Sequence, residues 1–413
     1  MRVNKNRLLL SAVSLVAILT YAFPMSNYIR FMIVALAALS ALLYHVIRIK
    51  RISSFYVFTY TAFVTWAAMS YLWTLSAKGY REQIFNMAVA ISINIFVATY
   101  SSAQEETFET MMRWVLPVMT IYLLESIMVG HFNSSGRFSA SGAVNQFGIS
   151  SSYIFLITIF LFKRKKLDRL HTWWIIGLMV VSGGLTLLSG SRKALINLAL
   201  FLVLVLLFEY NDKNIFKKLR NILGIAIIVA IVLFLILKVD FLYRLIGNRF
   251  ESLLSYYQGD VGEDLSALRR DNMKNDAFAL FSRHPVLGIG LNAFKYTARY
   301  GTYAHSDLYE LSCCLGAVGF ILYYLPVVVL FIMAFNQWRR NLPNAILPLA
   351  ITLSFLINEF SNISYIYGII HIFLGLAAGM VFINQRDSAA VQKLSDAQPK
   401  KTYRLRLRFK RAR

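Results

Sequence analysis

His305 is the residue of this 413-residue chain best suited to acid–base chemistry. It follows a charged segment and precedes a long apolar stretch, where membrane topology gives no reason for a histidine. A neutral imidazole can take a proton from a hydroxyl group near neutral pH. Asp307 and Glu310 follow closely enough to orient the imidazole or to balance its charge. A structural role for a lone histidine at a membrane surface is the competing interpretation.

Two further positions could bind phosphate. Arg192 and Lys193 lie in a short turn between two apolar stretches. A guanidinium group grips phosphate in two places and keeps its charge, although it could instead reach toward lipid headgroups. Arg269 and Arg270 lie in an amphipathic helical pattern over residues 265–281. They fall on different sides of that helix, so we expect only one of them to point at a site, and a solvated charged face is the alternative.

Other polar residues are candidates of a less specific kind. Arg137 and Asn145 form a polar cluster, in which Asn145 could bind sugar hydroxyls or cap the following helix. Glu359 is an acid within an apolar segment and therefore a candidate by default, with a neighbouring arginine as the alternative explanation. The sequence has no metal-ligand spacing and no phosphate-loop glycine pattern, so we expect neither a metal nor another cofactor.

The composition predicts an all-α polytopic membrane protein. Hydrophobic residues make up 58% of the chain and charged residues 15%, and the apolar runs are too long for barrel strands. The first run lacks a small-residue cleavage site and is expected to be a membrane helix. We predict about twelve transmembrane helices, at residues 8–24, 27–47, 54–75, 84–102, 108–129, 145–162, 173–189, 194–209, 219–238, 307–335, 344–360 and 364–383.

The basic residues predict the orientation. The net charge of +23 gathers between spans and in the tail, which indicates cytoplasmic flanks and both termini in the cytoplasm, with no nucleic-acid partner. Cys313 and Cys314 are adjacent and form no disulfide framework. The expected parts are N-terminal transmembrane helices (1–130), central transmembrane helices with outward turns (131–238), one large outward loop with short amphipathic helices (239–306), C-terminal transmembrane helices (307–384) and a basic cytoplasmic tail near anionic lipid (385–413).

Four ordered segments resemble the O-antigen ligase and polymerase superfamily of bacterial polysaccharide assembly. The order and the long loop before the His305 helix are more specific than any one motif, and the first third of the chain is similar only in being hydrophobic. The segments are residues 136–137 leading to Asn145, residues 190–195 around Arg192, Arg270 followed by residues 284–290, and residues 305–306 followed by Gly316 and Gly319, which we expect to permit close helix packing.

The resemblance implies a metal-independent, inverting glycosyltransferase in the bacterial cytoplasmic membrane, with its active site facing outward. Its donor would be a glycan on undecaprenyl diphosphate, and its acceptor another glycan or lipid A-core. Arg192 and Arg270 match arginines thought to hold the diphosphate, and His305 matches the histidine that activates the acceptor. The resemblance also suggests contact with other polysaccharide-assembly proteins.

The kind of transfer stays open between two enzymes and a transporter. Residues 303–311 and 319–324 look more like repeat-unit polymerases, which we favour. The spacing of residues 305–306 fits a ligase equally well, although Ile196 stands where leucine is usual. A lipid-linked sugar flippase is the third alternative, but the cations gather at outer ends and in one loop rather than at mid-span.

Overall fold

The computed structural model describes residues 54–102, 107–140, 144–163, 169–207, 215–258 and 265–397. The first two predicted spans and the end of the basic tail lie outside these residues. The described elements are α3 (Ser54–Met69), η1 (Ser70–Leu72), α4 (Ala77–Ser102), α5 (Thr107–Val129), β1 (His131–Phe132), β2 (Phe138–Ser139), α6 (Val144–Lys163), α7 (Arg169–Leu188), α8 (Arg192–Leu207), α9 (Ile215–Lys238), α10 (Asp240–Leu242), η2 (Tyr243–Gly247), α11 (Asn248–Gln258), α12 (Leu265–Arg283), α13 (Phe294–Thr297), α14 (Asp307–Arg339), α15 (Ile346–Glu359) and α16 (Gly368–Ala397).

Every span predicted from residue 54 onward coincides with a helix in the described part of the chain. Five of these helices contain stretches long and apolar enough to cross a membrane. The chain is therefore a multi-pass, mostly helical membrane protein, and the total of twelve spans and their orientation stay predictions. The stretches are Ala77–Thr99, Val144–Lys163, His171–Leu188, Asp307–Arg339 and Gly368–Arg386.

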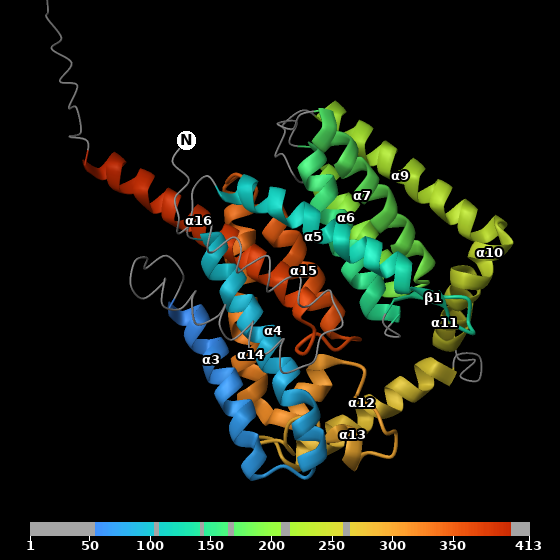
Figure 1. The fold of residues 1–413 in the computed structure, drawn as a ribbon, viewed down its shortest axis with the longest axis vertical. Helices are drawn as coiled ribbons and strands as arrows, with labels where there is room; N and C mark the ends of the chain where they lie inside the picture. Colours follow the sequence, from blue (N-terminus) through green and yellow to red (C-terminus); the bar gives the residue numbers. More distant parts are fainter. Residues whose placement is uncertain are drawn as a thin grey trace, which may run out of the picture.

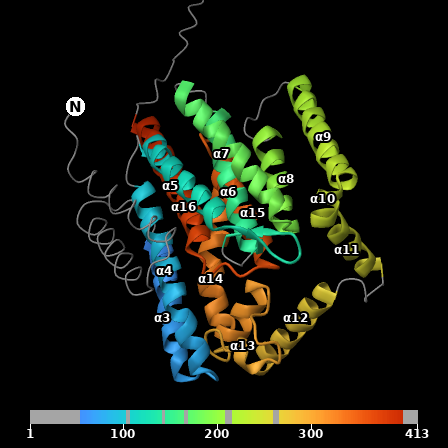
Figure 2. The same ribbon diagram turned by 45° about the vertical axis from the view of Figure 1, so that its right-hand side comes forward.

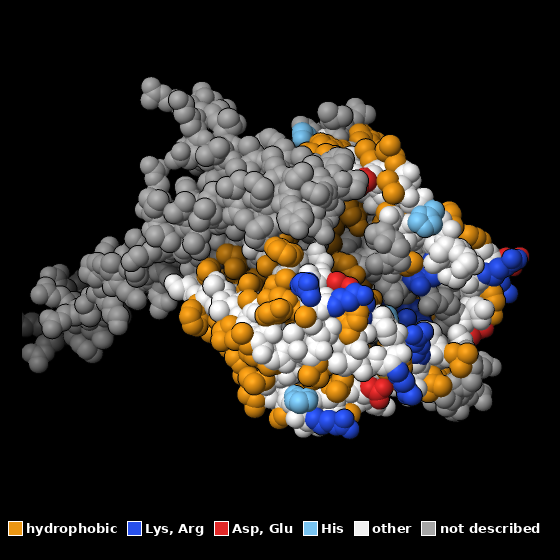
Figure 3. Space-filling model, turned by 60° about the horizontal axis from the view of Figure 1, so that its bottom comes forward, with side chains coloured by type: hydrophobic (Ala, Val, Ile, Leu, Met, Phe, Trp, Pro, Cys, Tyr) orange, Lys and Arg blue, Asp and Glu red, His pale blue; other side chains and the backbone are white. Residues whose placement is uncertain are grey.

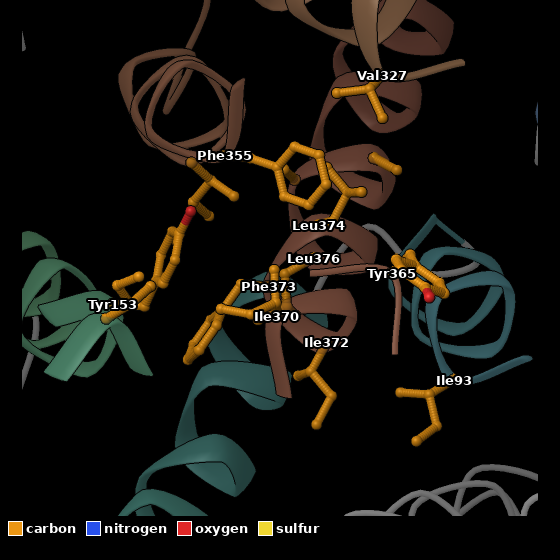
Figure 4. Packing of buried hydrophobic residues seen from close by; sticks show 14 of the residues in the cluster. Ile93, Tyr153, Val327, Phe355, Tyr365, Ile370, Ile372, Phe373, Leu374 and Leu376 are labelled. Atoms are coloured by element: carbon orange, nitrogen blue, oxygen red, sulfur yellow. The ribbon is translucent and has the colours of Figure 1, made fainter. Parts of the chain in front are cut away.

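The core of the bundle forms around α6, whose side chains are apolar or small on all faces and mostly buried. It packs against α7 and α8, while α16 packs against α4 and α15, and α14 packs against α3 (Figure 1). Tyr153 of α6 stacks on Phe373 of α16 with ring centroids 4.9 Å apart, beside Phe355 of α15 (Figure 4). These contacts join segments that are far apart in the sequence into one core.

The large loop, residues 239–306, follows α9 and is in its described residues a series of helices shorter than most of those in the bundle. Apolar side chains of α9 remain exposed, including Leu223, Ile231 and Phe234, as expected for a helix whose outer surface meets lipid. From its end, α10, η2 and α11 run along the edge of the molecule, and α12 returns beneath the bundle toward α13 (Figures 1 and 2). α12 ends at Arg283, two residues before Pro285, whose ring cannot continue a helix.

The helix that follows His305 is broken at Gly316, which corrects the expectation of a continuous helix there. Gly316 has φ 67° and ψ −173°, and a Cβ on it would lie 2.1 Å from the Val286 carbonyl oxygen. The segment 285–290 enters this break and satisfies the backbone groups on both sides of it. Its hydrogen bonds are Ile289 N–H to Cys313 O at 2.9 Å, Gly290 N–H to Cys314 O at 2.8 Å and Ala317 N–H to Pro285 O at 2.8 Å.

Candidate functional site

His305 lies in a left-handed backbone conformation, with φ 57°, one residue before the N-cap of α14. The backbone on both sides of it is held by hydrogen bonds. Glu310 Oε2 accepts a hydrogen bond from Ala304 N–H at 2.7 Å, and Asp307 N–H donates to Asn362 O at 2.9 Å. A non-glycine residue with positive φ is sparsely populated in free chains, so these bonds hold the imidazole at a defined place.

The two carboxylates near His305 in sequence bind backbone rather than the imidazole. Asp307 Oδ2 accepts hydrogen bonds from Ser364 N–H at 2.6 Å and Tyr365 N–H at 3.0 Å. Glu310 Oε2 accepts its hydrogen bond from the backbone N–H of Ala304. The expectation that one of them orients the imidazole directly is therefore replaced by an indirect role, in which they fix the backbone around His305. The ring that contacts the imidazole belongs to Tyr303, with centroids 4.4 Å apart.

Arg137 fastens the hairpin β1–β2 to the turn that carries Arg192. Its Nε donates to the Ser189 carbonyl at 2.8 Å, and its Nη2 donates to Asn145 Oδ1 at 2.8 Å. Asn145 therefore holds an arginine in the described structure. Gly190 makes the turn with φ 56°, and a Cβ there would lie 3.3 Å from Arg137 Cγ, so the two segments approach closely.

The cations from three separate parts of the sequence lie within electrostatic reach of one another. Burial first, and nearby positive charges in addition, lower the pKa of Lys193, ahead of the predicted span 194–209, to about 7. Arg270 has the largest of these effects, and Lys274, Arg192 and Arg137 add to it. Figure 3 shows Lys and Arg side chains gathered on the face that carries α12 and α13.

The same positive charges surround His305. Burial lowers the pKa of its imidazole to about 4, and Arg270, Lys193 and Arg269 contribute in that order. The imidazole is therefore neutral at pH 7 and has a lone pair to accept a proton. An anion that neutralised these cations would raise the pKa of His305 toward its ordinary value, so anion binding and proton acceptance are coupled.

Arg269 and Arg270 differ as the helical pattern predicted, although both act on His305. Arg269 is exposed and its Nη2 donates to the Tyr300 carbonyl at 3.4 Å. Arg270 is partly buried and has the stronger effect on the pKa of His305. Tyr300 in turn donates to Asp276 Oδ2 at 2.8 Å, which ties the segment before His305 to α12.

Glu359 is fully buried at the end of α15, and within the described part of the chain no salt bridge joins it to an arginine, contrary to that alternative. Its Oε2 accepts a hydrogen bond from the Tyr324 hydroxyl at 2.8 Å, and its carboxyl group lies within hydrogen-bonding reach of Asp307. Its backbone carbonyl accepts from Ser306 Oγ at 3.0 Å. Glu359 thus supports the backbone beside His305.

Lys274 and Tyr303 were missed as site residues. Lys274 follows Arg270 by four positions in α12, a spacing that places both on one face of a helix and could have revealed it. Tyr303 gives no such signal, since aromatic residues before membrane helices are common. Among the described residues, no group of three or more His, Cys, Asp or Glu side chains could hold a metal ion.

The helices are those of a membrane protein, and several cations lie near a neutral histidine in it. The O-antigen ligase family model matches residues 177–324, which include Arg192, Arg270 and His305 but neither Arg137 nor Glu359. This match confirms the resemblance found in the sequence and points to a multi-pass membrane enzyme of the O-antigen ligase and polymerase type. A search of curated proteins found no match.

Proposed function

We propose that this protein is a glycosyltransferase of the cytoplasmic membrane that transfers or polymerises oligosaccharide repeat units carried on undecaprenyl diphosphate, with its active site facing outward. The observation that carries this proposal is the convergence of Arg192, Lys193, Arg270 and Lys274 on one region that also contains neutral His305. A diphosphate needs cations, and a sugar acceptor needs a base. The site supplies both.

The diphosphate is assigned to Arg192 and Arg270, with Lys193 and Lys274 beside them. In the reaction, the bond between the anomeric carbon and the diphosphate oxygen breaks, and the diphosphate leaves as an anion. Fixed cations stabilise the charge that develops on that oxygen. Arginine suits this role because its planar group binds two oxygens at once.

His305 is assigned as the general base that accepts the proton of the acceptor hydroxyl group. The acceptor hydroxyl oxygen attacks the anomeric carbon from the face opposite the diphosphate, which inverts the configuration, and its proton passes to the imidazole. The bound diphosphate offsets the positive charge around His305, so the imidazole becomes a stronger base when the donor is in place. No metal is required in this scheme, because the side-chain cations take the role of a Lewis acid.

We favour a repeat-unit polymerase, on the run from Tyr303 to Leu311 and its resemblance to such enzymes. An O-antigen ligase that delivers the glycan to lipid A-core is the second candidate, because the description of the matching family names a ligase. A flippase would need charges at mid-membrane in place of the cation cluster described here.

A transfer assay with purified protein and an undecaprenyl-diphosphate oligosaccharide separates these functions. One arm supplies the same lipid-linked unit as acceptor, and the other supplies lipid A-core. Lengthening glycan ladders without core identify a polymerase, and a single transfer onto core identifies a ligase. Absence of both products, together with passage of intact donor across liposome membranes, would overturn the proposal in favour of a flippase.

A further inference from the structure

Asp307 and Glu359 form a buried pair of carboxyl groups behind His305. Both side chains are 0% exposed. Asp307 Oδ1 and Glu359 Oε1 have no hydrogen-bond donor, although the two carboxyl groups lie within hydrogen-bonding reach of each other. Their other oxygens are occupied, so these two oxygens are the ones left for the contact between the groups.

The surroundings of the pair do not neutralise two negative charges. Asp307 Oδ2 has the backbone N–H groups of Ser364 and Tyr365, Glu359 Oε2 has the Tyr324 hydroxyl, and the Ser364 hydroxyl also hydrogen-bonds the Glu359 carboxyl group. These donors are uncharged, and no salt bridge within the described residues reaches either carboxyl group. Two ionised carboxylates in contact away from water repel strongly, whereas one proton between them makes a short charge-assisted hydrogen bond.

We propose that Asp307 and Glu359 share a single proton, and that this protonated pair positions His305 by clamping the connection between α15 and α16 onto the start of α14. Four contacts make the clamp besides the pair itself. They are Ser306 Oγ to Glu359 O at 3.0 Å, Asp307 N–H to Asn362 O at 2.9 Å, and the hydrogen bonds of Asp307 Oδ2 with Ser364 N–H at 2.6 Å and Tyr365 N–H at 3.0 Å.

The clamp acts on the residues that directly follow His305, and it is a positioning device rather than part of the reacting centre. The strained φ of 57° at His305 persists only while the backbone on both sides is held. Glu310 holds the preceding residue Ala304, and the Asp307–Glu359 pair holds the following ones. Repulsion within an unprotonated pair would push α15 away from α14 and release that side.

Infrared spectroscopy of the full-length purified protein tests the shared proton directly, without any transfer assay. At neutral pH we expect the carbonyl band of a protonated carboxylic acid, and we expect Asp307→Asn and Glu359→Gln each to remove the same component of it. Glu310→Gln checks the other buried carboxyl of the site, and Glu251→Gln replaces an exposed carboxyl as the matched control. A band of unchanged intensity in both amide variants, or one that Glu310→Gln alone removes, would overturn the proposal.

The positioning role is tested by rescue and rests on the proposed function. A glutamine at position 359 can donate its amide N–H to Asp307 in place of the shared proton, so Glu359→Gln should keep transfer close to wild type. Glu359→Leu should lower it on the order of a hundredfold, as misplacement of a catalytic group does. Equal activity in both variants would overturn the role, while a failure of transfer in wild-type protein would count against the proposed function alone.

Discussion

Glu310 and Ala304 are joined across His305: the carboxylate of Glu310, inside α14, accepts the backbone N–H of Ala304 at 2.7 Å. The helix after the histidine therefore fixes the residue before it. A group held in this way loses little freedom when substrate binds, which is what a general base requires of its support.

His305→Asn should abolish glycan transfer and leave the protein folded. Asparagine tolerates the left-handed conformation better than most residues, so the backbone at φ 57° should survive the change. The measurement is transfer activity together with the thermal unfolding midpoint in detergent. Full activity in this variant would rule out the general-base role, and a large fall in the midpoint would indicate a structural role instead.

Arg270→Gln should move the acidic limb of the pH–rate profile to higher pH. Burial and then Arg270 lower the pKa of His305 to about 4, so wild-type kcat/KM should fall only when the pH approaches that value. Removal of one cation raises the pKa toward its ordinary value, and protonated, inactive histidine then appears at higher pH. Arg283→Gln, on the exposed end of the same helix, is the control and should leave the limb in place.

Binding of the donor should raise the pKa of His305, whereas the nearby cations lower it. The diphosphate neutralises the positive surroundings of His305, so the acidic limb of kcat, which reports the enzyme–substrate complex, should lie at higher pH than that of kcat/KM. The two profiles of wild-type enzyme provide the test. Coincident limbs would show that the diphosphate binds away from the histidine.

Arg192→Lys should lower kcat on the order of a hundredfold, because lysine keeps the charge but loses the two-point grip on a developing diphosphate anion. Arg220→Lys, an exposed arginine of α9, is the matched control. Steady-state kinetics of both variants check the expectation. Wild-type kinetics for Arg192→Lys would indicate that this residue anchors the turn to lipid headgroups.

Gly316→Ala should destabilise the protein strongly. The left-handed backbone alone disfavours alanine by about 1–3 kcal/mol, and the added Cβ would lie 2.1 Å from Val286 O. Gly177→Ala, at a helical position with open space around it, should be nearly neutral. Thermal unfolding of the two variants gives the comparison, and equal midpoints would mean that the 285–290 segment does not occupy the break in solution.

Chelating agents should leave transfer unchanged, since arginine and lysine side chains carry the charge that a metal would otherwise supply. The assay compares activity with and without a chelator in excess. A strict requirement for an added divalent cation would contradict the metal-independent scheme.

The sequence alone determined the helices and singled out the residues of the proposed site. Long apolar runs can satisfy their backbone in lipid only as helices, so every predicted span from residue 54 onward appears as one. The expected roles of Arg192, Arg270 and His305 came from residue type and from the resemblance to the O-antigen ligase and polymerase superfamily, and the fold brings the three residues into one region.

Tertiary structure decided the break in α14 and the contacts between residues that are far apart in the sequence. The break at Gly316 exists because residues 285–290 insert their backbone into it, and a helical run gives no sign of that partner. The link between Arg137 and Ser189 spans 52 positions, and the meeting of Asp307 with Glu359 spans 52 as well. Such pairings follow from how the helices pack, since polar groups removed from water must find partners wherever the fold brings them.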